Sequence, residues 1–185
     1  MYKLLNKILL IFMNIGTVLV AAIEFTNNKY DRLITFIAIF PLLLLPFFIN
    51  RTKFKLSEKE TFLYYIFIFI ADFIGCVCNL YNNISWYDIF AHFTSGAFTF
   101  VLAIIIYNHI SKNNSNNKML KVLFCLGVVA LIAILWEVFE FSIDTIINTN
   151  LQHNQDTGVV DTMQDMIVAL MGGVMSSLYI IFKNN

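Results

Sequence analysis

The chain has 185 residues, of which 59% are hydrophobic and only 13% are charged. Soluble domains are about 45–50% apolar and about 25% charged, so this composition excludes an ordinary soluble protein and indicates an integral membrane protein. The formal net charge is zero, which gives no reason to expect a nucleic-acid partner. Three cysteines in apolar segments predict neither a disulfide framework nor a zinc finger.

Six apolar stretches are long enough to cross a bilayer as helices, which takes about 20 residues. In chain order they are Lys7–Glu24, Leu33–Ile49, Thr61–Leu80, Trp86–Ile110, Met119–Ile147 and Val159–Phe182. We therefore predict an all-α fold, a polytopic membrane protein built as a bundle of six transmembrane helices. We expect one domain, residues 1–185, with a motif-bearing part at 86–177. The first stretch resembles a signal peptide in charge and length, but we expect an uncleaved anchor.

Basic residues predict the orientation, because lysine and arginine are enriched in the cytoplasmic loops of membrane proteins. If the N-terminus lies inside, ten of the twelve basic residues fall in inner segments, and only Lys29 and Arg32 fall outside. The outer links Tyr81–Ser85 and Asn148–Gly158 contain none. The predicted topology is therefore N-in, C-in.

The last three predicted helices contain acidic residues with no basic residue in the same stretch. There is no lysine or arginine from Val122 to Phe182, and none in residues 60–111. A carboxylate at the centre of a bilayer helix costs about 2.5–3.5 kcal/mol. A bound cation, protons or water must therefore compensate these charges.

The spacing of these residues places them on one face of each helix. Residues three or four apart share a helix face, and this spacing holds for Asp88–His92, Glu137–Glu140–Asp144 and Asp161–Asp165. In the predicted orientation all of them lie within about 15 Å of the outer helix ends, at 1.5 Å per residue. Charged side chains in a span usually face the bundle interior. The three stripes therefore predict one polar site near the outer leaflet.

Carboxylates combined with one imidazole favour a hard or borderline divalent cation such as Mn, Mg, Zn, Ca or Fe, and such sets hold metals inside helical bundles. We predict a divalent metal cation as the cofactor. The predicted ligands are His92, Glu137, Glu140, Asp144, Asp161 and Asp165. The predicted catalytic residues are His92, as ligand or general base, and Asp88, which would orient it.

Structural roles stay open for two of the acids because both fit helix caps. Ser85–Asp88 has the spacing of a capping box, and so does Asp161–Gln164 with Asp161 as the N-cap. In these alternatives Asp88 and Asp161 close helix N-termini and bind nothing.

Other polar residues have their own alternatives. Asp144 could lie in water at the membrane edge, and His92 could be a hydrogen-bonded structural residue. Glu137 and Glu140 lie inside an apolar run, and no cap explains them. Asp72 lies in the middle of the third span. Three roles stay open for it: an outlying ligand, a proton-relay group or a packing residue.

Three short motifs carry a resemblance to a known family. They are Tyr87–Phe93 with Gly96, which fits Asp-x-x-x-His-Phe-x-x-Gly, then Trp136–Phe141 and Val160–Met166. Together they resemble the YjdF-like uncharacterised bacterial integral membrane proteins, which are distantly similar to VanZ-like envelope proteins. The resemblance covers Trp86 to Ser177. It implies a multi-pass protein of the bacterial cytoplasmic membrane with a link to the cell envelope.

Three functions are compatible with these features. The first is a metal-dependent hydrolase or transferase acting on a membrane lipid or lipid-linked envelope substrate, with Lys29 and Arg32 holding a phosphate headgroup. The second is a cation or proton transporter, in which Asp72 would extend the path inward. The third is a non-catalytic envelope or stress protein whose acids are structural.

Overall fold

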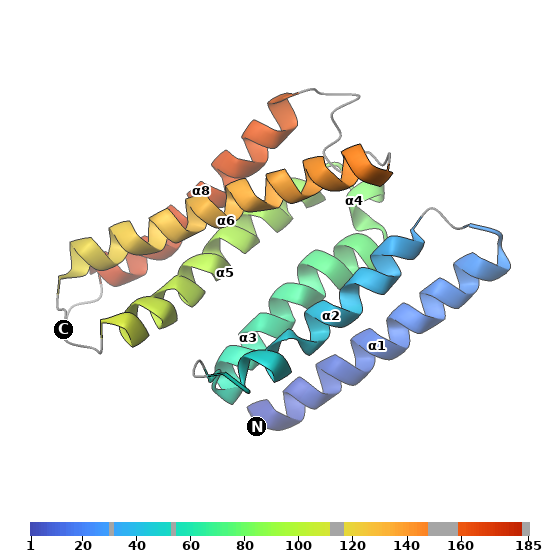
Figure 1. Ribbon diagram of the computed structural model, residues 1–185, viewed down its shortest axis with the longest axis horizontal. Coiled ribbons are helices and arrows are strands. Elements are labelled where there is room, and N and C mark those ends of the chain that lie inside the picture. The colour runs from blue at the N-terminus through green and yellow to red at the C-terminus, as the bar shows by residue number, and fades with distance from the viewer. Residues whose placement is uncertain (30–31, 53–54, 112–116, 148–158, 183–185) are drawn as a thin grey trace. The chain divides into compact units, whose positions relative to one another are not determined.

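The computed structural model describes residues 1–29, 32–52, 55–111, 117–147 and 159–182. Every regular element in these ranges is a helix, which confirms the predicted all-α fold (Figure 1). The elements are α1 (Tyr2–Thr26), α2 (Leu33–Ile49), α3 (Glu58–Ile68), the π-helix η1 (Phe69–Val77), α4 (Leu80–Asn83), α5 (Tyr87–Ile110), α6 (Lys118–Ile147) and α8 (Val159–Phe182).

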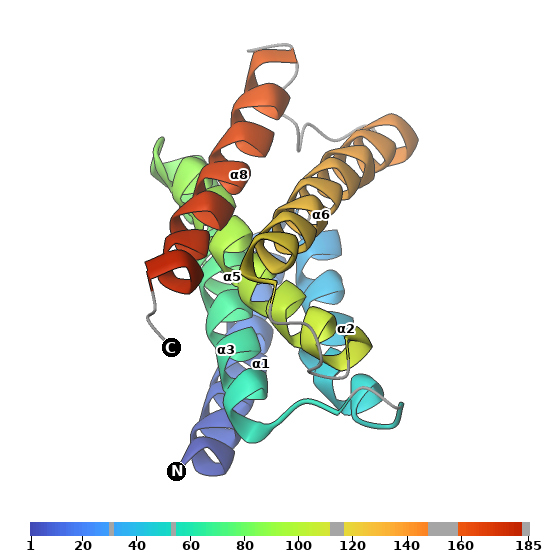
Figure 2. The same cartoon turned by 90° about the vertical axis from the view of Figure 1, so that its left-hand side faces the viewer.

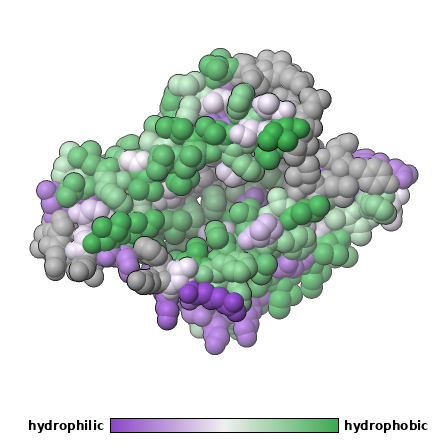
Figure 3. Space-filling view, in the orientation of Figure 1, coloured by the Kyte–Doolittle hydropathy of each residue, from purple (hydrophilic) through white to green (hydrophobic). Residues whose placement is uncertain are grey.

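Five helical runs are long and apolar enough to cross a membrane: α1, α3 continued by η1, α5, α6 and α8. The remaining predicted span, α2, has 17 residues and is therefore about 26 Å long at 1.5 Å per residue. That length lies at the lower limit for a transmembrane helix. Large apolar side chains are widely exposed, and they cover much of the visible face in Figure 3. In a bilayer such side chains face lipid. The N-in, C-in orientation stays a prediction.

The chain divides into two compact units, Met1–Tyr87 and Asp88–Asn185. The first unit contains α1, α2, α3, η1 and α4, and the second contains α5, α6 and α8. The predicted motif-bearing part, 86–177, falls almost entirely within the second unit.

Polar side chains fix the helix ends of the first unit. Ser57 is the N-cap of α3 and forms a capping box with Glu60, so two backbone N–H groups at this helix start gain partners. The buried Asn6 of α1 donates to the backbone oxygen of Glu58 (3.0 Å) and to its carboxylate (2.9 Å). These bonds fix the start of α1 against the start of α3.

Two prolines lie inside α2, which continues through both of them. Pro46 has no N–H to donate to the carbonyl of Leu42 four residues earlier. The Tyr64 hydroxyl on α3 donates to that carbonyl instead, at 2.8 Å. A side chain from a neighbouring helix therefore satisfies the backbone group that the proline leaves open, as is common in membrane helices.

The third predicted span changes geometry halfway along, where α3 becomes the π-helix η1. Arg32 lies at the end of this π-helix and donates to the carbonyl oxygens of Cys76 (2.8 Å) and Val77 (3.2 Å). Carbonyls in the last turn of a helix have no partner within the helix, so Arg32 caps them. Arg32 also forms an ion pair with Glu24 at the end of α1. The guanidinium of Arg32 therefore has partners within the first unit, and its phosphate-binding role stays a prediction.

The second unit is held together by an apolar core and by close helix packing. Phe100 and Ala103 of α5 pack against Cys125 and Val129 of α6, all with at most 1% exposure. Val129 also lies next to Gly173 of α8. Figure 2 shows that α6 and α8 diverge toward the end of α6 and the start of α8. The predicted site residues lie on these two segments and at the start of α5.

Candidate metal centre

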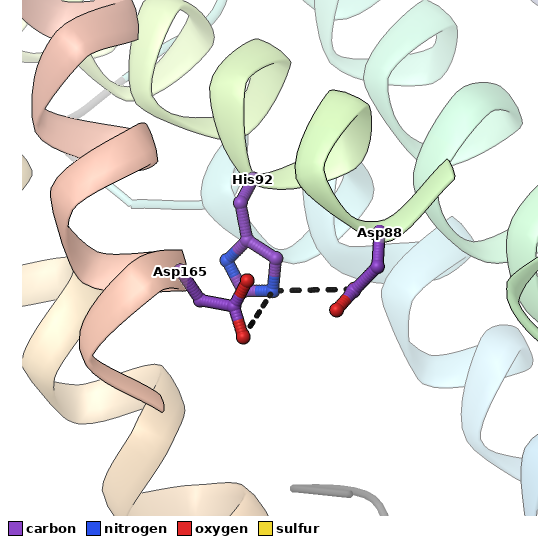
Figure 4. Close-up of side chains that lie close together, drawn as sticks. All are labelled: Asp88, His92 and Asp165. Carbon is purple, nitrogen blue, oxygen red and sulfur yellow. Dashed lines mark ion pairs between the residues drawn. The ribbon is translucent and has the colours of Figure 1, made fainter. Parts of the chain in front are cut away.

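The structure brings Asp88, His92 and Asp165 together at one point (Figure 4). Asp88 and His92 occupy the first two turns of α5, and Asp165 is on the second turn of α8. The Nε2 atom of His92 lies 3.5 Å from an Asp88 oxygen and 3.9 Å from an Asp165 oxygen. The side chains are 28%, 12% and 6% exposed for Asp88, His92 and Asp165. The group is therefore shielded from its surroundings, with Asp88 on its more open side.

Two glycines allow α5 and α8 to come close enough for this contact. A Cβ on Gly96 would lie 1.8 Å from the backbone oxygen of Ala169, and a Cβ on Gly172 would lie 2.0 Å from that of Phe93. Both distances exclude any side chain, so the helices meet backbone to backbone. His92 lies one turn before Gly96 on the same face of α5. The glycine contact therefore sets the distance between His92 and the acid on α8.

The distances within this group fit a shared cation. One ligand atom from each of the three residues lies within 4.8 Å of the other two. Atoms bound to one ion at about 2.0–2.4 Å are separated by about 3–5 Å. The two separations from His92, 3.5 and 3.9 Å, are longer than normal hydrogen bonds and fall in that range. Two carboxylates and an imidazole also match the donor set of hard and borderline divalent cations.

Glu137 is the most buried of the remaining predicted ligands, with 5% exposure. Its carboxylate accepts a hydrogen bond from the side chain of Thr162, in the first turn of α8. The charges of His92, Asp88 and Asp161 act on it as well. Glu137 thus belongs to the same polar cluster. Sequence analysis did not identify Thr162, because a threonine in an apolar helix gives no signal that separates it from packing.

Glu140 is half-buried, one turn after Trp136 on α6. The indole N–H of Trp136 donates to a Glu140 oxygen at 2.9 Å. Glu140 also lies within electrostatic range of His92, Glu137 and Asp88. The sequence placed Trp136 in a family motif but assigned it no partner, although its i, i+4 spacing to Glu140 is a usable signal.

The last two predicted ligands lie nearer the helix ends. Asp161 is half-buried in the first turn of α8, and its charge acts on Glu137 and Asp165. Because α8 begins at Val159, Asp161 lies inside the helix, so the N-cap alternative for it is wrong. Asp144 is half-buried one turn beyond Glu140. Its role as a ligand stays a prediction.

Asp72 lies in η1, in the first unit, and is half-buried. The outer link that contains His153 and Asp156 lies outside the described residues.

The long apolar helices define a multi-pass membrane protein. Residues 7–185 match a family described as predicted membrane protein (DUF2238), and the chain belongs to that family. The match reaches well beyond the stretch from Trp86 to Ser177 that carried the sequence resemblance. The YjdF-like and VanZ-like resemblance stays a prediction. No curated protein and no solved structure matches the chain.

Proposed function

We propose that this protein binds a divalent cation at Asp88, His92 and Asp165, and uses it to hydrolyse or transfer a group on a lipid or lipid-linked substrate of the bacterial cell envelope. The observation that carries the proposal is the meeting of these three side chains at the ends of two apolar helices. When bound, the cation would polarise a phosphoryl or carbonyl oxygen or activate water.

The excess of negative charge supports a cation. His92 lies beside Asp88 and Asp165, and its charge interacts with those of Glu137 and Glu140. Residues 122–182 contain no lysine or arginine. Burying the charges of Glu137 and Asp165 without a compensating cation is costly. A divalent ion bound by Asp88 and Asp165 would offset much of this cost. His92 would serve as ligand or general base, and Asp88 would orient its ring.

The length of α6 supports a site at headgroup level. Its 30 residues span about 45 Å, against about 30 Å for the hydrocarbon core. If Lys121 lies at the cytoplasmic boundary of the hydrocarbon core, this core ends about 20 residues later, near Phe141. Glu140 then lies at the outer boundary, and Trp136, which is 44% exposed, lies at the depth where tryptophan is enriched. Such a site reaches a lipid headgroup without moving it into the bilayer.

The packing of the second unit favours catalysis over transport. Beyond the polar cluster, the buried core between α5 and α6 consists of Phe100, Ala103, Cys125 and Val129. These four side chains offer a cation no oxygen ligand. A proton path through Asp72 would have to run through the first unit instead.

The test is turnover of envelope lipids in nanodiscs, with and without a chelator. Phosphate release and lipid mass spectra would be measured for the wild type, Asp165→Asn and Asp72→Asn. We expect metal-dependent turnover in the wild type and in Asp72→Asn, and loss of turnover in Asp165→Asn. Metal-independent turnover, or none on any envelope lipid, would contradict the proposal. Cation flux in proteoliposomes that Asp72→Asn abolishes would favour transport.

A further inference from the structure

Trp136 and Glu140 form a hydrogen-bonded pair on α6, which links an exposed side chain to the polar cluster. The Trp136 indole is 44% exposed, and its Nε1–H donates to Glu140 Oε1 at 2.9 Å. The ring is also packed against Phe139, with centroids 5.6 Å apart. The contact with Phe139 packs one side of the ring that carries this N–H.

This hydrogen bond leaves the second oxygen of Glu140 available to the cluster. A carboxylate offers about four lone-pair sites on two oxygens, and the indole uses one of them. His92 and Glu137 lie within electrostatic range of the same carboxylate. Glu140 therefore accepts from a surface donor and feels the charges of the polar cluster, while it lies outside the three residues whose ligand atoms are within 4.8 Å of one another.

The number of close ligand atoms gives Glu140 a reason to act as a further ligand. Asp88, His92 and Asp165 offer three close ligand atoms, whereas divalent cations take four to eight ligands in proteins. Further ligands must come from water, substrate or nearby carboxylates. Donors that hold a ligating carboxylate in place typically change metal affinity by about 10–100-fold.

We propose that Trp136 is a positioning residue that holds Glu140 as an additional ligand of the cation, so that the indole reports whether the site is occupied. This inference rests on the proposed function. Binding of a cation to one oxygen draws electron density from the carboxylate, which weakens its hydrogen bond to the indole. The emission of Trp136 therefore changes on binding.

The test uses the full-length protein in detergent with the Trp86→Phe substitution, which leaves Trp136 as the one tryptophan of the chain. The diamagnetic ions Zn²⁺ and Mg²⁺ are added separately, and binding is followed by calorimetry and by indole emission. We expect the emission to change with the same midpoint as the heat signal. In the same background Glu140→Gln should lose most of the emission change, and Asp165→Asn should lose it together with binding.

Affinity gives a second readout. We expect Trp136→Phe to weaken binding by about 10–100-fold, while the matched control Trp86→Phe leaves the affinity unchanged. If a metal binds but Trp136→Phe has wild-type affinity and the emission is silent, the inference is overturned and the metal site stands. If neither ion binds the wild type, the inference falls together with the proposed function.

Discussion

At the scale of single residues, the candidate site depends on one contact between two helices, where His92 of α5 meets Asp165 of α8. Asp88–His92 and Asp161–Asp165 follow from i, i+4 spacing. The contact of His92 with Asp165 depends on two glycines from different helices, and no periodicity within one helix encodes that. The ion pair between Glu24 and Arg32 was not predicted. The two residues lie on either side of the connection between α1 and α2, where helical spacing does not apply.

The contact between Tyr64 and the backbone of α2 is a residue-scale feature with a direct test. Tyr64→Phe removes the donor that satisfies Leu42, so we expect a loss of about 0.5–1.5 kcal/mol in the free energy of unfolding. In a Pro46→Ala background the new backbone N–H can bond to Leu42, and Tyr64→Phe should then cost clearly less. Unfolding in mixed micelles measures both costs. Equal costs in the two backgrounds would show that the hydroxyl does not replace the missing donor.

At the scale of helices, hydropathy located the spans closely and missed changes of geometry. The predicted Leu33–Ile49 and Val159–Phe182 agree with α2 and α8. The third span begins at Glu58, three residues before its predicted start, and the signal was present as the Ser57–Glu60 capping box. The π-helix η1 was not predictable, because hydropathy does not distinguish a π-helix from the α-helix that it continues.

The approach of α5 and α8 predicts how glycine substitutions behave. Gly96→Ala places a Cβ against the backbone of Ala169 and must push the helices apart, so we expect a loss of about 1–3 kcal/mol in stability and weaker metal binding. Gly127→Ala is the matched control, since its Cβ meets nothing within 4 Å. We expect this substitution to stabilise α6 by about 0.5–1 kcal/mol.

Unfolding in mixed micelles and metal titration of these two variants test the packing argument. If Gly96→Ala bound metal and unfolded like Gly127→Ala, the backbone contact would not be what holds His92 and Asp165 together.

At the scale of the whole molecule, the predicted orientation decides which leaflet the site can reach. A cysteine-free variant carrying Lys29→Cys should react with a membrane-impermeant maleimide in intact cells. The inner counterpart Lys59→Cys should react only after permeabilisation, because the N-in, C-in topology places it in the cytoplasm. Both positions are exposed. The reverse labelling pattern would place the acidic cluster at the inner leaflet and contradict an outer-leaflet substrate.

The most direct test of the account is elemental analysis by mass spectrometry of the purified wild type and a His92→Gln/Asp165→Asn variant. Each protein is prepared from media supplemented in turn with the candidate divalent metals. The account predicts near-stoichiometric divalent metal in the wild type and its loss in a variant that retains wild-type helicity. Equal metal content in the two proteins, or none in either, would contradict the proposal that these side chains hold a cation.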